Sequence, residues 1–396
     1  MRRSGIDFAI ALVLLAACAD RGDKPAGIET AWHVGPRWTL VHELTIGAVE
    51  GPGPHVFATI GDIEVAPDGR IIVLERESNE IRIFDASGTH VRTAGRSGSG
   101  PGEFDAAHGL EWLPGTDSLL VNDGSANRYS IFDRDGRFVR SMVRPLTGFG
   151  YNFPGGVANG LFYEEGSRRV DQTTYESFLV GLRLVTQAVL VDTVSLLKPP
   201  SPAIPSYSVQ NARGGMYMAV PYTPTQVLDL SEDGALWWGF GSQYRIYQLT
   251  LEGDTLREVV VADAKPIPVS PADLQEWERS KFVRLFKERG GVIDFDRIPK
   301  HKPLFTDFFV DSAGFLWVDV PTADGRTAFD IFDTESRLLG RVATGIWRMP
   351  YVKPLVRNGR LYLVGLDDLT VPFVYVFRIE RAQVQVEEGQ RGASNR

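Results

Sequence analysis

The sequence predicts an all-β protein, a six-bladed β-propeller of four-stranded antiparallel blades with one short helical insertion. The 396-residue chain has 41 Gly and 24 Pro, which favour short strands and turns over a helical bundle. Tight turns between apolar strands recur, and their glycines lie 46, 45, 74, 80 and 45 residues apart. A four-stranded sheet of about 45 residues cannot bury both of its faces alone, so neighbouring sheets must stack around an axis.

Six turns mark the six expected blades. They are Pro67-Asp68-Gly69, Pro114-Gly115, Asn159-Gly160, Glu232-Asp233-Gly234, Ser312-Ala313-Gly314 and Asn358-Gly359. Most units have a second turn, at 84–88, 132–136, 251–253 and 332–336, where Asp side chains and Gly suit a hairpin. The strands expected in the first two units are Ile60–Val65, Ile71–Leu74, Ile81–Asp85, His90–Thr93, Gly109–Trp112, Ser118–Val121, Arg128–Phe132 and Phe138–Met142.

The ring is expected to close through an N-terminal strand. The glycine-rich connector Gly95–Phe104 has a near copy at Gly47–Phe57, so the segment before that copy should be an outer strand. Trp38–Ile46 has the apolar content for such a strand and would complete the sixth blade, Pro354–Arg378, which removes a sheet edge. Val384 and Val386 compete for the same place.

Insertions account for the two long spacings between turn glycines, of 74 and 80 residues. Residues 197–224 are polar or Pro-rich and are expected to form an extended crossing loop. Ser270 as N-cap, Pro271 and Asp273 predict the start of a helix that continues to Gly290-Gly291. We expect this helix to pack on the rim of the propeller, and the alternative is a mobile lid over its mouth.

The first residues predict export and a lipid anchor. A basic start is followed by ten apolar residues, Phe8–Ala17, too few to cross a bilayer but right for a signal-peptide core. The run ends at Leu15-Ala16-Ala17-Cys18, which resembles the bacterial lipobox, and the resemblance implies lipidation of Cys18, the only cysteine. An ordinary secretory signal is the alternative. Ala19 at the position after the cysteine implies delivery to the outer membrane rather than the inner one.

The expected domain order follows from these segments. Residues 1–17 form the signal peptide, 18–37 a flexible tether, 38–387 the propeller and 388–396 a disordered tail. We expect a monomer outside the cytoplasm. The net charge of −8 argues against nucleic-acid binding, and a single cysteine excludes an internal disulfide.

The units Ile60–Gly95 and Gly109–Arg144 resemble the NHL-type repeats of six-bladed bacterial propellers. The shared elements are an Asp-Gly turn, an apolar strand, an Asn/Arg-Ile-Phe-Asp strand such as Asn79–Asp85, and a second Gly turn. The Gly-Pro-Gly-Glu-Phe connector at Gly100–Phe104 belongs to the same pattern. The resemblance implies the fold and leaves the activity open.

Candidate binding residues fall at one end of the expected ring, in loops that surround the channel mouth opposite the Asp-Gly turns. The ligand-binding candidates are Glu75, Asn79, Asn122, Asp123, Arg128, Arg245, Arg326 and Asp367. This mixture of charges suits a polar small molecule or a protein partner, so the predicted function is a membrane-anchored binding or scaffold module without a cofactor. The alternative for each residue is simple solvation of a loop.

A hydrolase is the alternative function. Gluconolactonase-like propellers hold a divalent cation through Glu, Asn and Asp, and this resemblance implies Ca²⁺ or Mg²⁺ at Glu75, Asn122 and Asp123. No Ser nucleophile elbow, P-loop or His-Glu-x-x-His motif occurs, and six His are few for a zinc-dependent propeller lyase.

Overall fold

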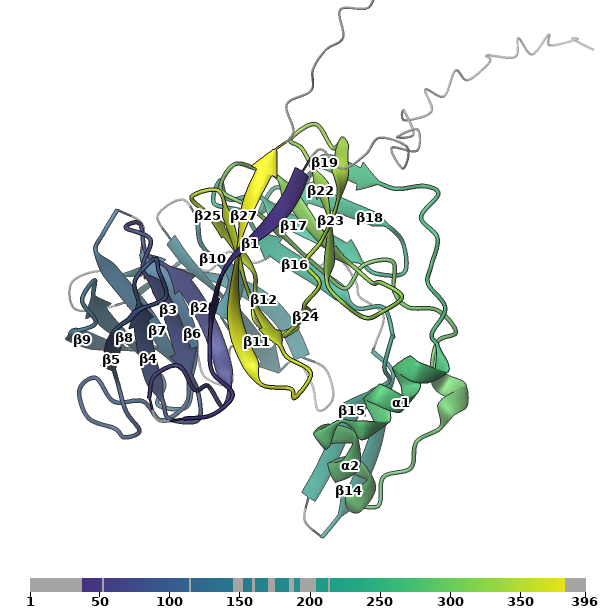
Figure 1. Cartoon of the computed structure of the whole chain (residues 1–396), viewed down its shortest axis with the longest axis horizontal. Coiled ribbons are helices and arrows are strands. Elements are labelled where there is room, and N and C mark those ends of the chain that lie inside the picture. Colours follow the sequence, from purple (N-terminus) through teal and green to yellow (C-terminus); the bar gives the residue numbers. More distant parts are fainter. Residues whose placement is uncertain are drawn as a thin grey trace, which may run out of the picture.

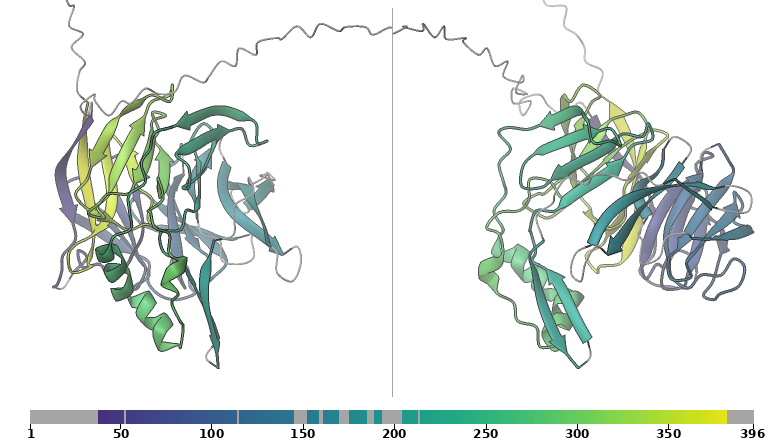
Figure 2. Two further views of the ribbon diagram at one scale, coloured as in Figure 1. Left: turned by 90° about the vertical axis from the view of Figure 1, so that its right-hand side faces the viewer. Right: turned by 180° about the vertical axis from the view of Figure 1, so that it is seen from behind.

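Six antiparallel sheets surround a common axis in the computed structural model (Figures 1 and 2). It describes residues 38–51, 53–113, 115–144, 152–158, 161–169, 175–184, 189–192, 204–212 and 214–381. The sheets are the blades of a six-bladed β-propeller, as the sequence predicts. The signal peptide, the tether, Asn159-Gly160, Val384, Val386 and the C-terminal tail lie outside the described residues.

Each blade is named here from its innermost to its outermost strand. Blade 1 consists of β2 (Ile60–Val65), β3 (Ile71–Glu75), β4 (Glu80–Phe84) and β5 (His90–Ala94). Blade 2 consists of β6 (Ala107–Leu113), β7 (Ser118–Asp123), β8 (Arg128–Asp133) and β9 (Phe138–Val143). Blade 3 consists of β10 (Asn152–Ala158), β11 (Leu161–Arg169), β12 (Tyr175–Leu184) and β13 (Val189–Asp192). Blade 4 consists of β16 (Gln226–Leu230), β17 (Leu236–Phe240), β18 (Arg245–Leu249) and β19 (Thr255–Val260). Blade 5 consists of β20 (Asp307–Val310), β21 (Leu316–Val320), β22 (Ala328–Phe332) and β23 (Leu338–Ala343).

Blade 6 joins the two ends of the described chain. Two short strands, β24 (Trp347–Arg348) and β25 (Leu355–Arg357), pair with β26 (Arg360–Leu366), which pairs with β27 (Pro372–Arg381). β1 (Trp38–Ile46) is the outermost strand and runs antiparallel to β27. The predicted closure through Trp38–Ile46 is therefore confirmed with its predicted bounds.

The eight strands predicted in blades 1 and 2 are confirmed to within two residues at each end. Their turns follow the predicted chemistry. Gly69 and Gly88 adopt φ of 89° and 83°, a region that side chains rarely occupy. The Asp85 carboxylate accepts the backbone N–H groups of Ser87 and Thr89, which fixes the second turn of blade 1.

Apolar clusters hold neighbouring blades together at all six junctions within the described part of the chain. Strand β3 shows how the alternation of side chains serves two junctions at once. Ile71 and Val73 pack towards blade 6, whereas Ile72 and Leu74 pack towards blade 2. The blades thus bury both faces only because they stand in a ring.

A β-bulge lets β1 serve both of its neighbours. Trp38 packs against Phe315 and Trp317 of blade 5, with ring centroids 4.8 and 5.7 Å apart. The register of β1 against β27 shifts between His42 and Leu44, so Ile46 turns to the opposite face and joins the cluster shared with blade 1.

The segment 197–224 is not wholly an extended loop as predicted. Its described part contains a hairpin, β14 (Ser206–Asn211) and β15 (Gly214–Ala219). Tyr207, Met216 and Met218 alternate onto one face of this hairpin and are buried there. The prediction failed because the apolar neighbours of these residues lie far along the chain, in the second insertion.

The predicted helix is two helices, and they do not pack on the rim of the blades. α1 (Pro271–Arg279) has the expected capping box of Ser270 and Asp273. Ser280 leaves helical geometry and accepts the N–H of Val283, so α2 (Lys281–Glu288) starts in a new direction. Val283 and Phe286 pack on the hairpin and, with the 3₁₀ turn η2 (Phe295–Arg297), complete a small inserted module, residues 204–219 and 270–300 (Figure 1).

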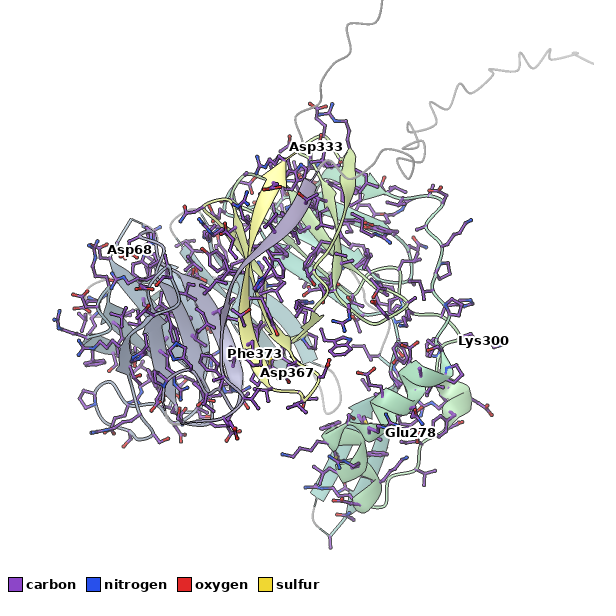
Figure 3. All side chains as sticks on the ribbon, viewed as in Figure 1. Asp68, Glu278, Lys300, Asp333, Asp367 and Phe373 are labelled. Carbon is purple, nitrogen blue, oxygen red and sulfur yellow. The ribbon has the colours of Figure 1, made fainter. Side chains whose placement is uncertain are left out.

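The ring has two distinct ends. The turn face carries the Gly turns between the first and second strands, and Asp68 and Asp333 mark it in Figure 3. The mouth face carries the connectors between blades and the loops between second and third strands, including Asp367, and the module projects from this side. No helix of the described residues is long and apolar enough to span a bilayer.

Candidate functional site

Glu75 and Asp123 occupy equivalent places, each as the last residue of the second strand of its blade. The buried Glu75 carboxylate accepts the N–H groups of Thr59 at 2.9 Å and Ser78 at 2.7 Å. Burial opposes its charge, but hydrogen bonds from Ser78 and Thr59 outweigh that effect and lower the pKa of Glu75. Asp123 likewise accepts the N–H groups of Asp105 at 3.0 Å and Ala106 at 3.1 Å. Both carboxylates therefore hold the connector that leads into their own blade.

Arg128 and Asn79 also bind connectors. The guanidinium of Arg128 donates to the carbonyls of Ser99 at 2.8 Å and Glu103, and it lies 3.3 Å from Asp123. The Asn79 amide donates to Ser97 Oγ at 3.0 Å from a backbone with φ of 53°. These contacts, together with backbone hydrogen bonds such as that from Gly98 N–H to the Phe104 carbonyl, fix the glycine-rich loop Gly95–Phe104.

The remaining candidates are spread over separate blades. Asn122 donates to Glu164 Oε1 at 2.8 Å, between blades 2 and 3. Arg245 pairs with Glu258 at 2.5 Å in blade 4, and the Arg326 guanidinium lies 4.4 Å from the Trp347 ring centroid. Asp367 accepts the N–H groups of Leu369 and Val371 within its own turn. Among the candidates, the structure brings the side chains of Asp123 and Arg128 into contact, whereas Glu75 and Asn79 bind different connectors.

Two of the proposed cation ligands, Glu75 and Asp123, bind the backbones of different blades. Across the described residues, His, Cys, Asp and Glu form no group of three or more arranged to hold a metal ion. The Ca²⁺ or Mg²⁺ site remains a prediction of the sequence alone.

Charged side chains from four blades gather instead along the ring axis. This axial cluster consists of Asp62, Glu64, Glu111, Asp229, Lys353 and Arg357. The innermost strands β2, β6, β16 and β25, with the residues just before β25, supply these groups. In the sequence, Asp62 and Glu64 alternate with Ile63 and Val65. Such an alternation indicates a strand with only one apolar face, as is possible for a strand that lines the channel.

Two aspartates of the cluster link neighbouring inner strands. Asp62 accepts the N–H of Leu110 in blade 2 at 2.8 Å, and Asp229 accepts the N–H of Val310 in blade 5 at 2.9 Å. Lys353 of blade 6 reaches past blade 5 to Asp229, with 2.5 Å between Nζ and Oδ1. The axis is therefore crossed by an ion pair rather than left as an open apolar channel.

Burial raises the pKa of several carboxyl groups in the axial cluster. Burial raises the pKa of Asp62 to about 7, while the hydrogen bond from Leu110 acts in the opposite direction. Burial and the nearby charges of Glu64 and Asp62 raise the pKa of Glu111 well above its usual value. Burial also raises the pKa of Asp229, although Lys353 lowers it. Four carboxyl groups face two cations, so the cluster has an excess of acid.

Replacing Asp62 with Asn is expected to stabilise the protein progressively as the pH rises from about 4 to about 7. The folded-state pKa of Asp62 lies above its unfolded value. Ionisation of Asp62 therefore destabilises the native state above about pH 7, and this destabilisation is absent below about pH 4. Asn keeps an acceptor for the Leu110 N–H. Thermal unfolding at pH 4 to 8 should show a gain of several degrees at the upper end, where about 1 kcal/mol is worth roughly 2–4 °C.

The exposed Asp263→Asn variant is the control, and it should follow the unmodified chain at every pH. A gain for Asp62→Asn that does not change with pH would contradict the assignment of the raised pKa to Asp62.

Comparisons with known proteins agree with the fold. A family described as a 6-bladed beta-propeller (DUF5128) matches residues 55–111, which span blade 1 and the start of blade 2. No curated protein matches the sequence. A solved member of the duf4221 family from Bacteroides vulgatus is 11% identical, with a TM-score of 0.50, and the alignment covers 87% of this chain and 99% of that chain.

Two further solved structures share less of the geometry. A putative exported protein from Bacteroides fragilis is 11% identical over 87% of this chain and 96% of that chain, with a TM-score of 0.46. A calcium-binding protein, regucalcin, from Agrobacterium tumefaciens is 12% identical over 85% of this chain and 96% of that chain, with a TM-score of 0.41. At these identities the comparisons show the fold alone, and the chain is a six-bladed β-propeller.

Proposed function

We propose that this chain is a binding protein that lies outside the cytoplasm, is anchored through a lipid on Cys18, and takes a polar, positively charged group at the axis of its ring. The observation that carries the binding role is the axial cluster. Apolar contacts already hold the blades together, so the ring does not need an excess of carboxyl groups at its centre. Groups with raised pKa values that converge from several elements are typical of binding and catalytic sites.

A cationic ligand fits the imbalance of charge. Asp62, Glu64 and Glu111 repel one another when ionised, and their neutral forms are favoured for that reason as well as by burial. A bound ammonium or guanidinium group would allow them to ionise and would gain charge-assisted hydrogen bonds in a region of low dielectric constant. Asp62 and Glu111 are partly accessible, so solvent reaches these two members of the cluster.

The binding role is tested by thermal unfolding in the presence of spermidine, a lysine dipeptide, a neutral oligosaccharide, Ca²⁺ and Mg²⁺. We expect a cationic compound to raise the Tm of the unmodified chain and to lose most of this effect in Glu111→Gln. Glu77→Gln, an exposed substitution in a mouth-face loop, should respond like the unmodified chain. A response confined to the neutral oligosaccharide, or one unaffected by Glu111→Gln, would exclude the axis as the cation site.

The anchor is tested separately by fractionating cells that produce Cys18→Ala. The lipobox-like segment and the position of the only cysteine support lipidation at this residue. We expect the unmodified chain in the membrane fraction and Cys18→Ala largely outside it. A Cys18→Ala protein that stays with the membranes would show that another feature anchors the chain.

A further inference from the structure

We infer that the tip of the inserted module binds the surface of an anionic lipid bilayer. The tip is defined as residues 279–292, which contain α2 and lie at the end of the module away from the blades (Figures 1 and 2). This binding does not depend on the anchor at Cys18 or on the axial cluster.

The tip exposes large apolar side chains. Phe282 is 51% exposed, Leu285 39% and Val292 81%. Each of these would be partly withdrawn from water by insertion among lipid chains, which is worth about 1.5–3 kcal/mol for a fully buried side chain of this size. The module does not need them for its own core, because Val283 and Phe286 fill that role against β14 and β15.

Cationic side chains alternate with the apolar ones. The tip carries five, Arg279, Lys281, Arg284, Lys287 and Arg289, against one acidic residue, Glu288. Lys287 pairs with Glu278, but Arg279, Lys281 and Arg284 make no ion pair with any described residue. The tip is thus positively charged in a chain whose net charge is −8.

The spatial pattern favours a fluid anionic surface over a folded partner. Phe282 and Leu285 lie three residues apart on α2, next to the buried stripe of Val283 and Phe286, and Lys281 and Arg284 flank them. A basic amphipathic helix with exposed Phe and Leu is the pattern of an interfacial helix, in which long cationic side chains reach the phosphates.

The base of the module is tied to the ring by side-chain contacts. Lys302 binds the carboxylate of Asp273 at 2.8 Å and the carbonyl of Thr322 in blade 5 at 3.1 Å, and Tyr222 donates to the carbonyl of Asp273. Contact of the tip with a bilayer would therefore fix the orientation of the propeller. Trp38 begins β1 at the turn face, opposite the module, so the tip does not repeat the contact expected from an anchor at Cys18.

The inference is tested by co-sedimentation of a chain that starts at Ala19 with phosphatidylcholine vesicles, with and without phosphatidylglycerol. This chain keeps every described element, since these begin at Trp38. We expect binding that requires phosphatidylglycerol and that weakens about tenfold or more in Lys281→Gln/Arg284→Gln, since each cation is worth about 1 kcal/mol near such a surface. Phe282→Ser/Val292→Ser should weaken it by a similar factor.

Val139→Ser/Val143→Ser is the matched control, because these two valines of β9 are 54% and 75% exposed on the ring. It should bind like the unmodified chain. Phe282→Trp should show a blue shift of its added fluorescence with anionic vesicles, whereas Val139→Trp should not.

Three results would overturn the inference. The first is no binding to vesicles that contain phosphatidylglycerol. The second is an equal loss of binding in the β9 control. The third is capture of soluble polyglutamate without binding to vesicles, which would identify the tip as a site for an acidic protein instead.

Discussion

A chain that begins at Gly47 instead of Trp38 is expected to lose cooperative unfolding of the ring. The deletion removes β1, whose Trp38 and Ile46 are 5% and 1% exposed and serve two different blade junctions. Loss of a buried Trp or Ile side chain costs about 2–5 kcal/mol each, and the strand also carries the ladder to β27. The total is comparable with the whole stability of a typical domain, about 5–15 kcal/mol.

A chain that begins at Trp38 is the matched control, and it should unfold like the full chain in urea, followed by circular dichroism. Because the shorter chain can fail to fold at all, Trp38→Ala provides a graded test, with an expected loss of about 3–5 kcal/mol. Thr39→Ala, an exposed change on the same strand, should have little effect. An unchanged urea midpoint for the chain that begins at Gly47 would refute closure through β1.

Arg144→Met is expected to destabilise the protein by about 3–5 kcal/mol, because it leaves a buried carboxylate without its cation. Arg144 and Glu164 are 1% and 0% exposed at the junction of blades 2 and 3, with 2.8 Å between guanidinium and carboxylate. Burial raises the pKa of Glu164, and Arg144 lowers it. Removing Arg144 must therefore raise this pKa further.

The sign of the pH effect follows from that shift. A carboxyl group whose folded-state pKa lies above its unfolded value weakens the native state as the pH rises, so the deficit of Arg144→Met should be larger at pH 8 than at pH 5. The double variant Arg144→Met/Glu164→Leu removes both charges and should recover much of the loss in urea unfolding. A deficit that is independent of pH and unchanged in the double variant would mean that lost packing, not the unpaired carboxylate, is responsible.

The turns and outer strands of the ring were predictable because their signals are local. Gly69, Gly88 and their counterparts must adopt positive φ, and the period of these glycines gives the length of a blade. The copy of the glycine-rich connector at Gly47 located β1 without any knowledge of its partner. The inserted module was not predictable in this way, since Met216 and Phe286 pack together only after the two insertions meet in space.

The candidate site was harder to predict than the fold. Glu75 and Asp123 stood out in the sequence as polar residues at strand ends, and the structure shows both binding connector backbones. Arg82, which was not a candidate, also binds the connector of blade 1, because its guanidinium donates to the carbonyl of Val56 at 2.6 Å. Asp62 and Lys353 lie near opposite ends of the described sequence, so only the closed ring reveals that they are neighbours.

The pairing of β1 with β27 has a consequence for biosynthesis. The ribosome completes Trp38–Ile46 first and Pro372–Arg381 last among the described strands, so the partner of the earliest strand exists only once nearly the whole polypeptide has been made. A nascent chain therefore cannot finish its final blade. Every prematurely terminated product therefore has an unpaired sheet edge that proteases can reach.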